Sequence, residues 1–369
     1  MHLLTISRDA LLAPLQSVVG IVEKRNTQPI VSNVLLEKHG DRLTLVTTDN
    51  EMQIRTSCGG LIAGEDGAIT VGARKLLDIL RVLPDGAELK FELAENRLVL
   101  RAGRSRYQLQ TLPASDFPSI DIPEGIRARL SVSQGQLKHM LGQTHFAMAQ
   151  QDIRYYLNGL LIIGDNEQLR AVATDSHRLA YTATPLAVPC PERAEAILPR
   201  KTVLELNRQL ADSDDPVEII LTGSQAVFRF GAIELITKLI EGRFPDFERV
   251  IPQQHPTQIR FERLPLQAAL QRAAILTSDK LRSVRLVFES GLLKIITTNT
   301  EHEEATNELE IDYQGDKLDI GFNITYLLEV LANISTEQVV WHLNDSNSSA
   351  LITEPDDAHF KYVVMPMRI

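Results

Sequence analysis

The sequence predicts an α+β protein built from three copies of one unit, each combining antiparallel sheet with two helices. One short pattern occurs three times at a spacing of about 125 residues, as TTDNEMQIR (47–55), ATDSHRLAY (173–181) and TTNTEHEEA (297–305). Helical and strand patterns recur at the same spacing. The chain of 369 residues therefore divides into predicted domains over 1–124, 125–252 and 253–369.

Each unit contains two apolar patterns with helical period, one before and one after the short repeated pattern. The helices are expected over 9–19 and 73–83, over 135–148 and 199–210, and over 264–276 and 324–334. Between them, segments such as VLLEKHGDRLTLVTT (34–48) alternate apolar and polar residues around Gly, Asp and Asn, which is typical of antiparallel hairpins.

ATDSHRLAY brings together the three residue types of a hydrolase triad, Asp175, Ser176 and His177. Adjacent residues on extended chain point to opposite faces, so these side chains are not expected to converge as a nucleophile, a base and its orienting group. A polar turn between two strands is the simpler interpretation. A hydrolase using Ser176 and His177 stays open only as a remote alternative.

Composition argues against several other classes of protein. The two cysteines, Cys58 and Cys190, lie in different units without a CxxC or a surrounding His cluster, so neither a disulfide nor zinc is indicated. Walker and dinucleotide-binding motifs are absent, and no cofactor is expected. We find no signal peptide or membrane-length apolar run, and the chain is expected in the cytoplasm.

Charge is unevenly distributed along the chain. The formal net charge is −10, yet the six segments in which helices are expected together carry a positive charge. The rest of the chain is correspondingly more acidic. Either this is chance, or one helical surface faces a polyanion such as DNA while the outer surface is acidic.

Five segments in order resemble the β sliding clamps of bacterial replicative DNA polymerase (DNA polymerase III). They are QDIRYYLNG (151–159), ATDSHRL (173–179), KLIEGRFPDFERV (238–250), GFNITYLLEVL (321–331) and YVVMPMR (362–368). The resemblance implies the DNA clamp fold and a head-to-tail homodimeric ring around duplex DNA. It also implies a non-catalytic processivity factor that is placed by a clamp loader and tethers replicative and other polymerases and repair proteins.

Helix spacing agrees with a ring of two chains. Six helices about 10 Å apart on a circle leave a hole too narrow for a duplex, whereas twelve leave roughly 28 Å. A protein-only scaffold of repeated domains remains the main alternative function.

The two ends of such a chain must be complementary. Arg97, Arg101, Arg104 and Arg106 lie near the end of the first unit, and an acidic run lies in the third. The resemblance implies a dimer interface formed by Arg104, Arg106, Tyr107, Leu109, Ile275, Leu276, Glu301, Glu303 and Glu304; Glu308 and Glu310 extend the acidic run.

The resemblance also implies binding residues. DNA would be contacted by Arg25, Gln151 and Tyr155. A pocket for a short Leu/Phe-containing peptide would be lined by Leu157, Thr174, Ser176, His177, Arg178, Leu179, Pro245, Val250, Val363 and Met365. A second lobe would use Arg154, Tyr156, Asn323, Tyr326, Asn347, Ser349, Met365, Pro366 and Met367. Ser176 stands where the family usually has Gly, which would cost stability if the turn requires a positive φ.

Overall fold

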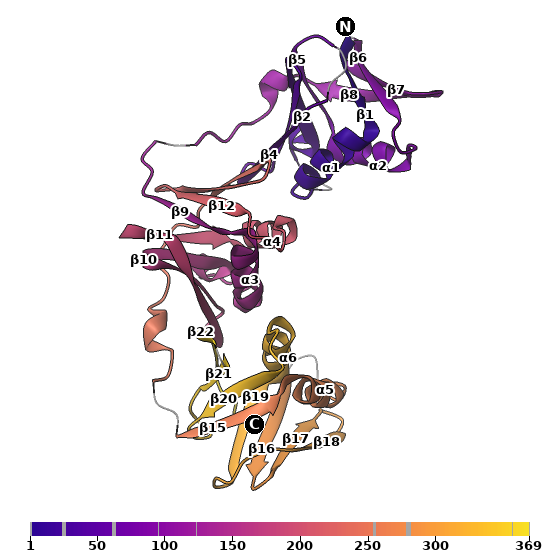
Figure 1. Ribbon diagram of the computed structural model, residues 1–369. Coiled ribbons are helices and arrows are strands. Elements are labelled where there is room, and N and C mark those ends of the chain that lie inside the picture. Colours follow the sequence, from indigo (N-terminus) through magenta and orange to yellow (C-terminus); the bar gives the residue numbers. More distant parts are fainter. Residues whose placement is uncertain are drawn as a thin grey trace. The chain divides into compact units, whose positions relative to one another are not determined.

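The computed structural model describes residues 2–23, 27–60, 64–94, 96–122, 124–253, 256–277, 282–355 and 357–368 (Figure 1). The chain forms two compact units. The first contains residues up to Gly135 together with Leu204–Leu239, and the second contains Gln136–Val203 and the residues from Ile240 onward.

The helices confirm the expected pattern of two per repeat. They are α1 (Arg8–Val19), α2 (Ala73–Val82), α3 (Gln134–Thr144), α4 (Arg200–Gln209), α5 (Arg263–Ala274) and α6 (Ile324–Asn333). Helix α3 is shorter than predicted, because His145–Ala147 forms a 3₁₀ turn. The Thr144 hydroxyl donates to the Met140 carbonyl, a local bond that competes with continued helix.

The first unit contains one antiparallel sheet of twelve strands. In spatial order these are β1 (His2–Ser7), β6 (Glu88–Ala94), β7 (Arg97–Ala102), β8 (Ser105–Leu112), β5 (Gly67–Gly72), β2 (Asn33–His39), β3 (Arg42–Thr48), β4 (Met52–Cys58), β14 (Ile233–Lys238), β13 (Gln225–Phe230), β12 (Pro216–Leu221) and β9 (Ala128–Ser133). The hairpin predicted over 34–48 is confirmed as β2 and β3, with Leu36 opposite Leu45.

The second unit contains two sheets. One has the order β10 (Gly159–Thr174), β11 (Arg178–Pro199), β22 (Asp357–Val364), β21 (Ala350–Glu354), β20 (Gln338–Leu343) and β15 (Thr257–Glu262). The other has the order β18 (Glu304–Glu310), β17 (Leu292–Thr298), β16 (Ser283–Glu289) and β19 (Leu318–Asn323). The long strands β10 and β11 take the place of the four shorter strands found between the helices of the other repeats.

Two strand pairs join successive repeats. In the first unit β4 pairs with β14, with Ile54 opposite Leu235. In the second unit β11 pairs with β22, with Ala180 opposite Tyr362. Each pair combines the strand after the repeated turn of one repeat with the last strand of the next. We call these two pairs the internal joints.

Candidate functional site

The stretch ATDSHRLAY forms the turn between β10 and β11, as the sequence predicts. The Asp175 Oδ1 atom accepts the backbone N–H groups of His177 (3.0 Å) and Arg178 (3.1 Å). The Thr174 hydroxyl donates to the Arg178 carbonyl at 2.6 Å. Ser176 has a φ of 72°, a left-handed conformation that costs a serine more than a glycine.

The first repeat contains the same turn. There Asp49 Oδ1 accepts the backbone N–H groups of Glu51 (2.9 Å) and Met52 (2.8 Å), and Asn50 has a φ of 74°. In the third repeat Asn299 Oδ1 accepts the N–H groups of Glu301 and Glu303, both at 3.0 Å. The first two repeats therefore share one side-chain-to-backbone turn, and the third uses a related turn that is one residue longer, with Thr298 opposite Glu304.

This geometry gives no support to a hydrolase triad. The Ser176 hydroxyl donates to the Asp175 carbonyl (2.5 Å) and accepts from Arg154 Nη2 (3.0 Å), so its partners are not a base. Asp175 uses its Oδ1 atom to hold the backbone and its Oδ2 atom to bind Arg178. Nucleophile activation requires a hydrogen bond to a base that is itself oriented by a third group.

Arg178 is the buried ion that fixes this turn, with a side chain 7% exposed. Its guanidinium binds Asp175 (3.1 Å) and Glu329 of α6, and it donates to the Phe146 carbonyl at 2.6 Å. The ring of Tyr326 lies 4.2 Å from its central carbon. Burial opposes the charge and would lower the pKa of Arg178, but Tyr362, Glu329 and Asp175 outweigh this, so the pKa is raised and the charge is permanent.

An apolar pocket of about 300 Å³ opens beside the turn. All ten residues predicted for the first lobe line it, and Arg154 and Tyr156 of the predicted second lobe line it too. Its inner surface is part of the core, because Leu179 and Val363 belong to a buried cluster. Val250 and Met365 are each 46% exposed and stand at its edge. Such a mixture of apolar surface and a few polar groups suits an anchored side chain.

Phe247 lines the same pocket and was missed in the sequence. It is 5% exposed and stacks on Tyr181 at a centroid distance of 6.0 Å. The signal was available, because Phe247 lies between the predicted residues Pro245 and Val250 in the segment RFPDFERV.

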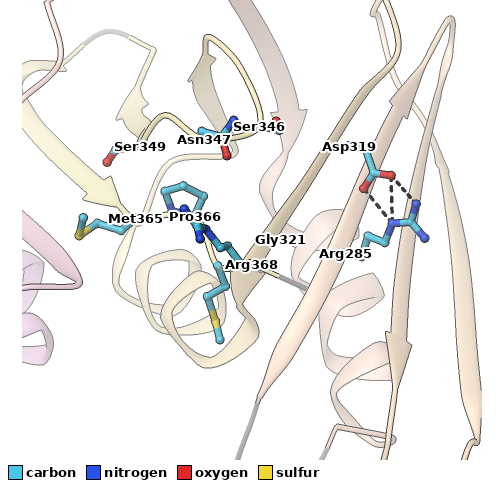
Figure 2. Close-up of a pocket in the computed structure, with 10 residues that line it drawn as sticks. Arg285, Asp319, Gly321, Ser346, Asn347, Ser349, Met365, Pro366 and Arg368 are labelled. Carbon is cyan, nitrogen blue, oxygen red and sulfur yellow. Dashed lines mark hydrogen bonds and ion pairs between the residues drawn. The ribbon is translucent and has the colours of Figure 1, made fainter.

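The residues predicted for the second lobe are divided between two cavities that share Met365. Asn347, Ser349, Met365, Pro366 and Met367 line a separate cavity of about 840 Å³ (Figure 2). Two others line neither cavity. Asn323 accepts the Thr325 N–H (2.9 Å) and caps α6, while Tyr326 packs on the Arg178 guanidinium. The larger cavity also contains residues that were not predicted, namely Arg285, Asp319, Gly321, Ser346 and Arg368.

Two of the three predicted DNA contacts lie on an exposed loop before β10. Gln151 is exposed with a φ of 57°, and Tyr155 is 56% exposed. Arg154 binds Asp152 at 2.9 Å, and this hydrogen-bonded pair lowers the pKa of Asp152 to about 2. Asn158 holds the loop closed by accepting the Asp152 N–H at 2.9 Å. Arg25 lies outside the described residues.

The predicted interface residues lie on two strands and one helix end. Arg104 and Arg106 are exposed on the β7–β8 hairpin, where Tyr107 and Leu109 are half-buried. Glu301, Glu303 and Glu304 are exposed before and at the start of β18. Ile275, directly after α5, is 78% exposed, and Leu276 is half-buried.

Within the described ranges, no group of three or more His, Cys, Asp or Glu side chains could hold a metal ion. Among the same residues, no helix is both long and apolar enough to span a membrane.

Comparison with known proteins gives three matches to one family along the chain. The N-terminal domain of the DNA polymerase III beta subunit matches residues 1–121, its central domain residues 131–246, and its C-terminal domain residues 248–368. The beta sliding clamp of Pseudomonas aeruginosa is 46% identical over 365 residues, covering 99% of both chains. That of Escherichia coli K12 is 41% identical with the same coverage.

Solved structures agree. The DNA polymerase III subunit beta of Pseudomonas aeruginosa has a TM-score of 0.96 at 46% identity, covering 100% of both chains. The same values hold for a sliding clamp of that organism bound to griselimycin. A Caulobacter crescentus beta sliding clamp has a TM-score of 0.93 at 39% identity, covering 100% of this chain and 99% of the other. The chain therefore belongs to the β sliding clamp family, the non-catalytic processivity subunits of DNA polymerase III.

Proposed function

We propose that two copies of this chain, each with domain boundaries near residues 124 and 252, join head to tail into a ring around duplex DNA. The observation that carries the proposal is the repetition of the internal joints, β4 with β14 and β11 with β22. A third joint of the same kind would combine β18 with β8, and these strands lie in the last and first repeats of the chain. A second copy supplies the missing partner.

Both strands have the free edge that this joint requires. β18 is the outermost strand of its sheet. β8 pairs with β5 only at Thr111 and Leu112, so among the described residues its edge from Ser105 to Gln110 has no strand partner on that side. Unpaired edges of this kind are open to pairing with another chain.

The charges on the two edges are complementary. β8 begins directly after Arg104 and contains Arg106, whereas β18 contains Glu304, Glu308 and Glu310. Opposite charges on two facing strands favour one register and accelerate association, and like charges would prevent β18 from pairing with itself.

Helix ends support the same arrangement. At the internal joint Gly20, directly after α1, faces Glu205 and Arg208 of α4. In the third repeat the residue directly after α5 is Ile275. The α2 positions that correspond to Glu205 and Arg208 are Ile79 and Val82, and Val82 is 76% exposed. Ile275 and Val82, both exposed aliphatic side chains, thus stand where the internal joint has a polar contact. The core of an interface between separate chains is apolar in this way.

DNA binding is proposed for the helical surface, independent of base sequence. The helical segments together are positive, but the chain as a whole has a net charge of −10. We therefore expect few phosphate contacts and weak electrostatic affinity, so that encirclement holds the protein on the DNA. Gln151, Tyr155 and Arg25 are the individual contacts that we propose.

The apolar pocket is proposed to bind a short Leu/Phe-containing peptide of partner proteins. Leu157, Leu179 and Val363 offer buried apolar walls, and the flexible Met365 at the edge suits several related ligands. A related clamp of Pseudomonas aeruginosa has been solved with griselimycin bound, so a clamp with 46% identity accommodates a ligand.

The partners proposed for this pocket are the clamp loader, replicative and other DNA polymerases, and repair proteins that carry such a motif. A processivity subunit must act where the chromosome is, and we therefore place the protein in the bacterial cytoplasm, associated with the nucleoid through DNA.

Cross-linking tests the head-to-tail joint. Superposing β18 and β8 on the internal joints puts Ala305 opposite Tyr107, by analogy with Ile54 opposite Leu235. Tyr107→Cys with Ala305→Cys should form covalent dimers on oxidation, because directly opposed residues have Cα atoms about 4.5–5.5 Å apart. Gln110→Cys with Ala305→Cys, three residues out of register, is the matched control. Equal cross-linking of both pairs, or none of either, would refute this joint.

A further inference from the structure

The second cavity, of about 840 Å³, adjoins the apolar pocket, because Met365 lines both. Three parts of the second unit enclose it. The turn between β20 and β21 provides Asn347, the end of the chain provides Pro366 and Arg368, and the β16–β19 pair provides Arg285 and Asp319.

The segment that separates the two cavities is held at both ends. The Met365 N–H donates to the His177 carbonyl (2.9 Å), and the Met367 N–H donates to the Gly321 carbonyl (2.8 Å). Pro366 lies between them, with a fixed φ and no N–H to donate. Because Met365 lines both cavities, a peptide that leaves the apolar pocket past Met365 enters the larger cavity.

The cavity carries an excess of positive charge among its lining residues. Asp319 engages Nε (2.8 Å) and Nη2 of Arg285, so one guanidinium is neutralised. Arg368 is exposed, and in the described part of the chain no carboxylate forms an ion pair with it. The lining thus contains two guanidinium groups and one carboxylate, and Figure 2 shows the Arg285–Asp319 pair on one side and the segment of Pro366 and Arg368 on the other.

We propose that this cavity is a specificity subsite for acidic residues that precede the Gln of a Gln-Leu-x-Leu-Phe peptide. The inference rests on the proposed function of the apolar pocket, in which Leu and Phe fill that pocket and Gln lies near Met367. The residues before Gln are then the ones that reach Arg368 and the remaining donors of Arg285. Guanidinium groups bind carboxylates through parallel N–H donors, which makes Asp or Glu the best match.

Because the protein is acidic overall, a preference for an acidic peptide flank would report on this subsite. At a net charge of −10, the long-range field of the chain favours a basic flank on any ligand. An acidic flank is preferred only if local contacts exceed that field. A measured preference for Asp over Lys therefore reports on this subsite, and it should weaken as salt is added.

Calorimetric titration tests the proposal with three capped peptides, in which Asp-Asp, Ser-Ser or Lys-Lys precedes Gln-Leu-Ser-Leu-Phe. On the parent protein at low salt we expect the Asp-Asp peptide to bind about tenfold more tightly than the Lys-Lys peptide, as for two partly exposed charge contacts. Arg285→Gln with Arg368→Gln should remove or invert this preference, and the Ser-Ser peptide should bind both proteins equally.

The control is Arg101→Gln with Arg129→Gln, which changes the net charge equally and releases the surface carboxylate of Glu92, while Glu218 keeps its ion pair with Arg229. It should retain the tenfold preference. If the parent favours the Lys-Lys peptide or neither, or if the Arg285 and Arg368 variant keeps the preference, the subsite is refuted while the apolar pocket stands. Failure of the Ser-Ser peptide to bind the parent would refute the peptide pocket itself, and this inference with it.

Discussion

The free edges of β8 and β18 correspond to strands that are already paired at the internal joints. Inside the chain, β4 and β14 are already paired, and the adjoining helix ends meet through Gly20, Glu205 and Arg208. At the free edges the strands are strongly charged, and Val82 and Ile275 are exposed to solvent. Covalent connection allows a polar joint, whereas a joint between two chains must supply its own apolar contact and its own specificity.

Removing the apolar side chains at the end of α5 should have the largest effect on dimerisation. Ile275→Ala with Leu276→Ala is expected to raise the dimer dissociation constant at least about 100-fold, because two central apolar side chains are lost. Sedimentation velocity over a concentration series would measure it. Leu264→Ala, on helix α5 that precedes Ile275 and 61% exposed, is the control and should remain dimeric. A double variant that is still a dimer at nanomolar concentration contradicts the assignment of this end.

Deleting residues 365–369 should abolish peptide binding and polymerase stimulation while leaving dimerisation and retention on DNA circles intact. The deletion removes Met365 from the apolar pocket and the whole segment that separates the two cavities. Calorimetry with Gln-Leu-Ser-Leu-Phe should change from micromolar affinity, about −8 kcal/mol, to no detectable binding. Unchanged affinity would mean that the pocket is misplaced and that ATDSHRLAY is only a turn.

Charge reversal at the β8 edge should have a smaller effect than apolar truncation. Arg104→Glu with Arg106→Glu is expected to weaken the dimer about tenfold, and more at low salt, where repulsion from Glu301, Glu303 and Glu304 is least screened. The dissociation constant measured at two ionic strengths gives the answer. A dimer whose affinity is insensitive to salt would show that these charges do not face one another.

The two equivalent turns offer the finest comparison. Ser176 and Asn50 have nearly the same φ, 72° and 74°, but Asn tolerates this conformation better than Ser. Ser176→Gly should stabilise the protein by about 0.5–1 kcal/mol, and Asn50→Gly should change its stability little. Thermal unfolding of both variants beside the parent measures this. Equal shifts would show that the backbone strain at Ser176 is relieved elsewhere, for instance by the bond from Arg154.

Much of the fold could be predicted from the sequence because its cues are local. The helix at 324–334 and the hairpin at 34–48 follow from hydrophobic period and turn residues, and both were located to within about two residues. The internal joints could not be predicted, because a pairing such as Ile54 with Leu235 leaves no signal in either segment alone.

The candidate site also combines features that the sequence predicts with contacts that it does not. The apolar pocket came from matched motifs, and its residues converge as expected, but Phe247 and the Arg285–Asp319 pair were missed. The resemblance implies a peptide lobe that includes Asn323 and Tyr326, and the structure adds that Asn323 caps α6 and that Tyr326 packs on Arg178. Proximity of residues far apart in sequence depends on tertiary packing, which a local pattern does not contain.

Encirclement of DNA is the central claim, and retention on closed and cut DNA tests it most directly. The parent protein, placed on nicked circular DNA by an ATP-driven loader, should remain bound through gel filtration and be released when the circle is linearised. Covalent closure through Tyr107→Cys and Ala305→Cys after loading should keep it on the circle even at high salt. Equal retention on circular and linear DNA, falling only with salt concentration, would contradict a ring and indicate ordinary electrostatic binding.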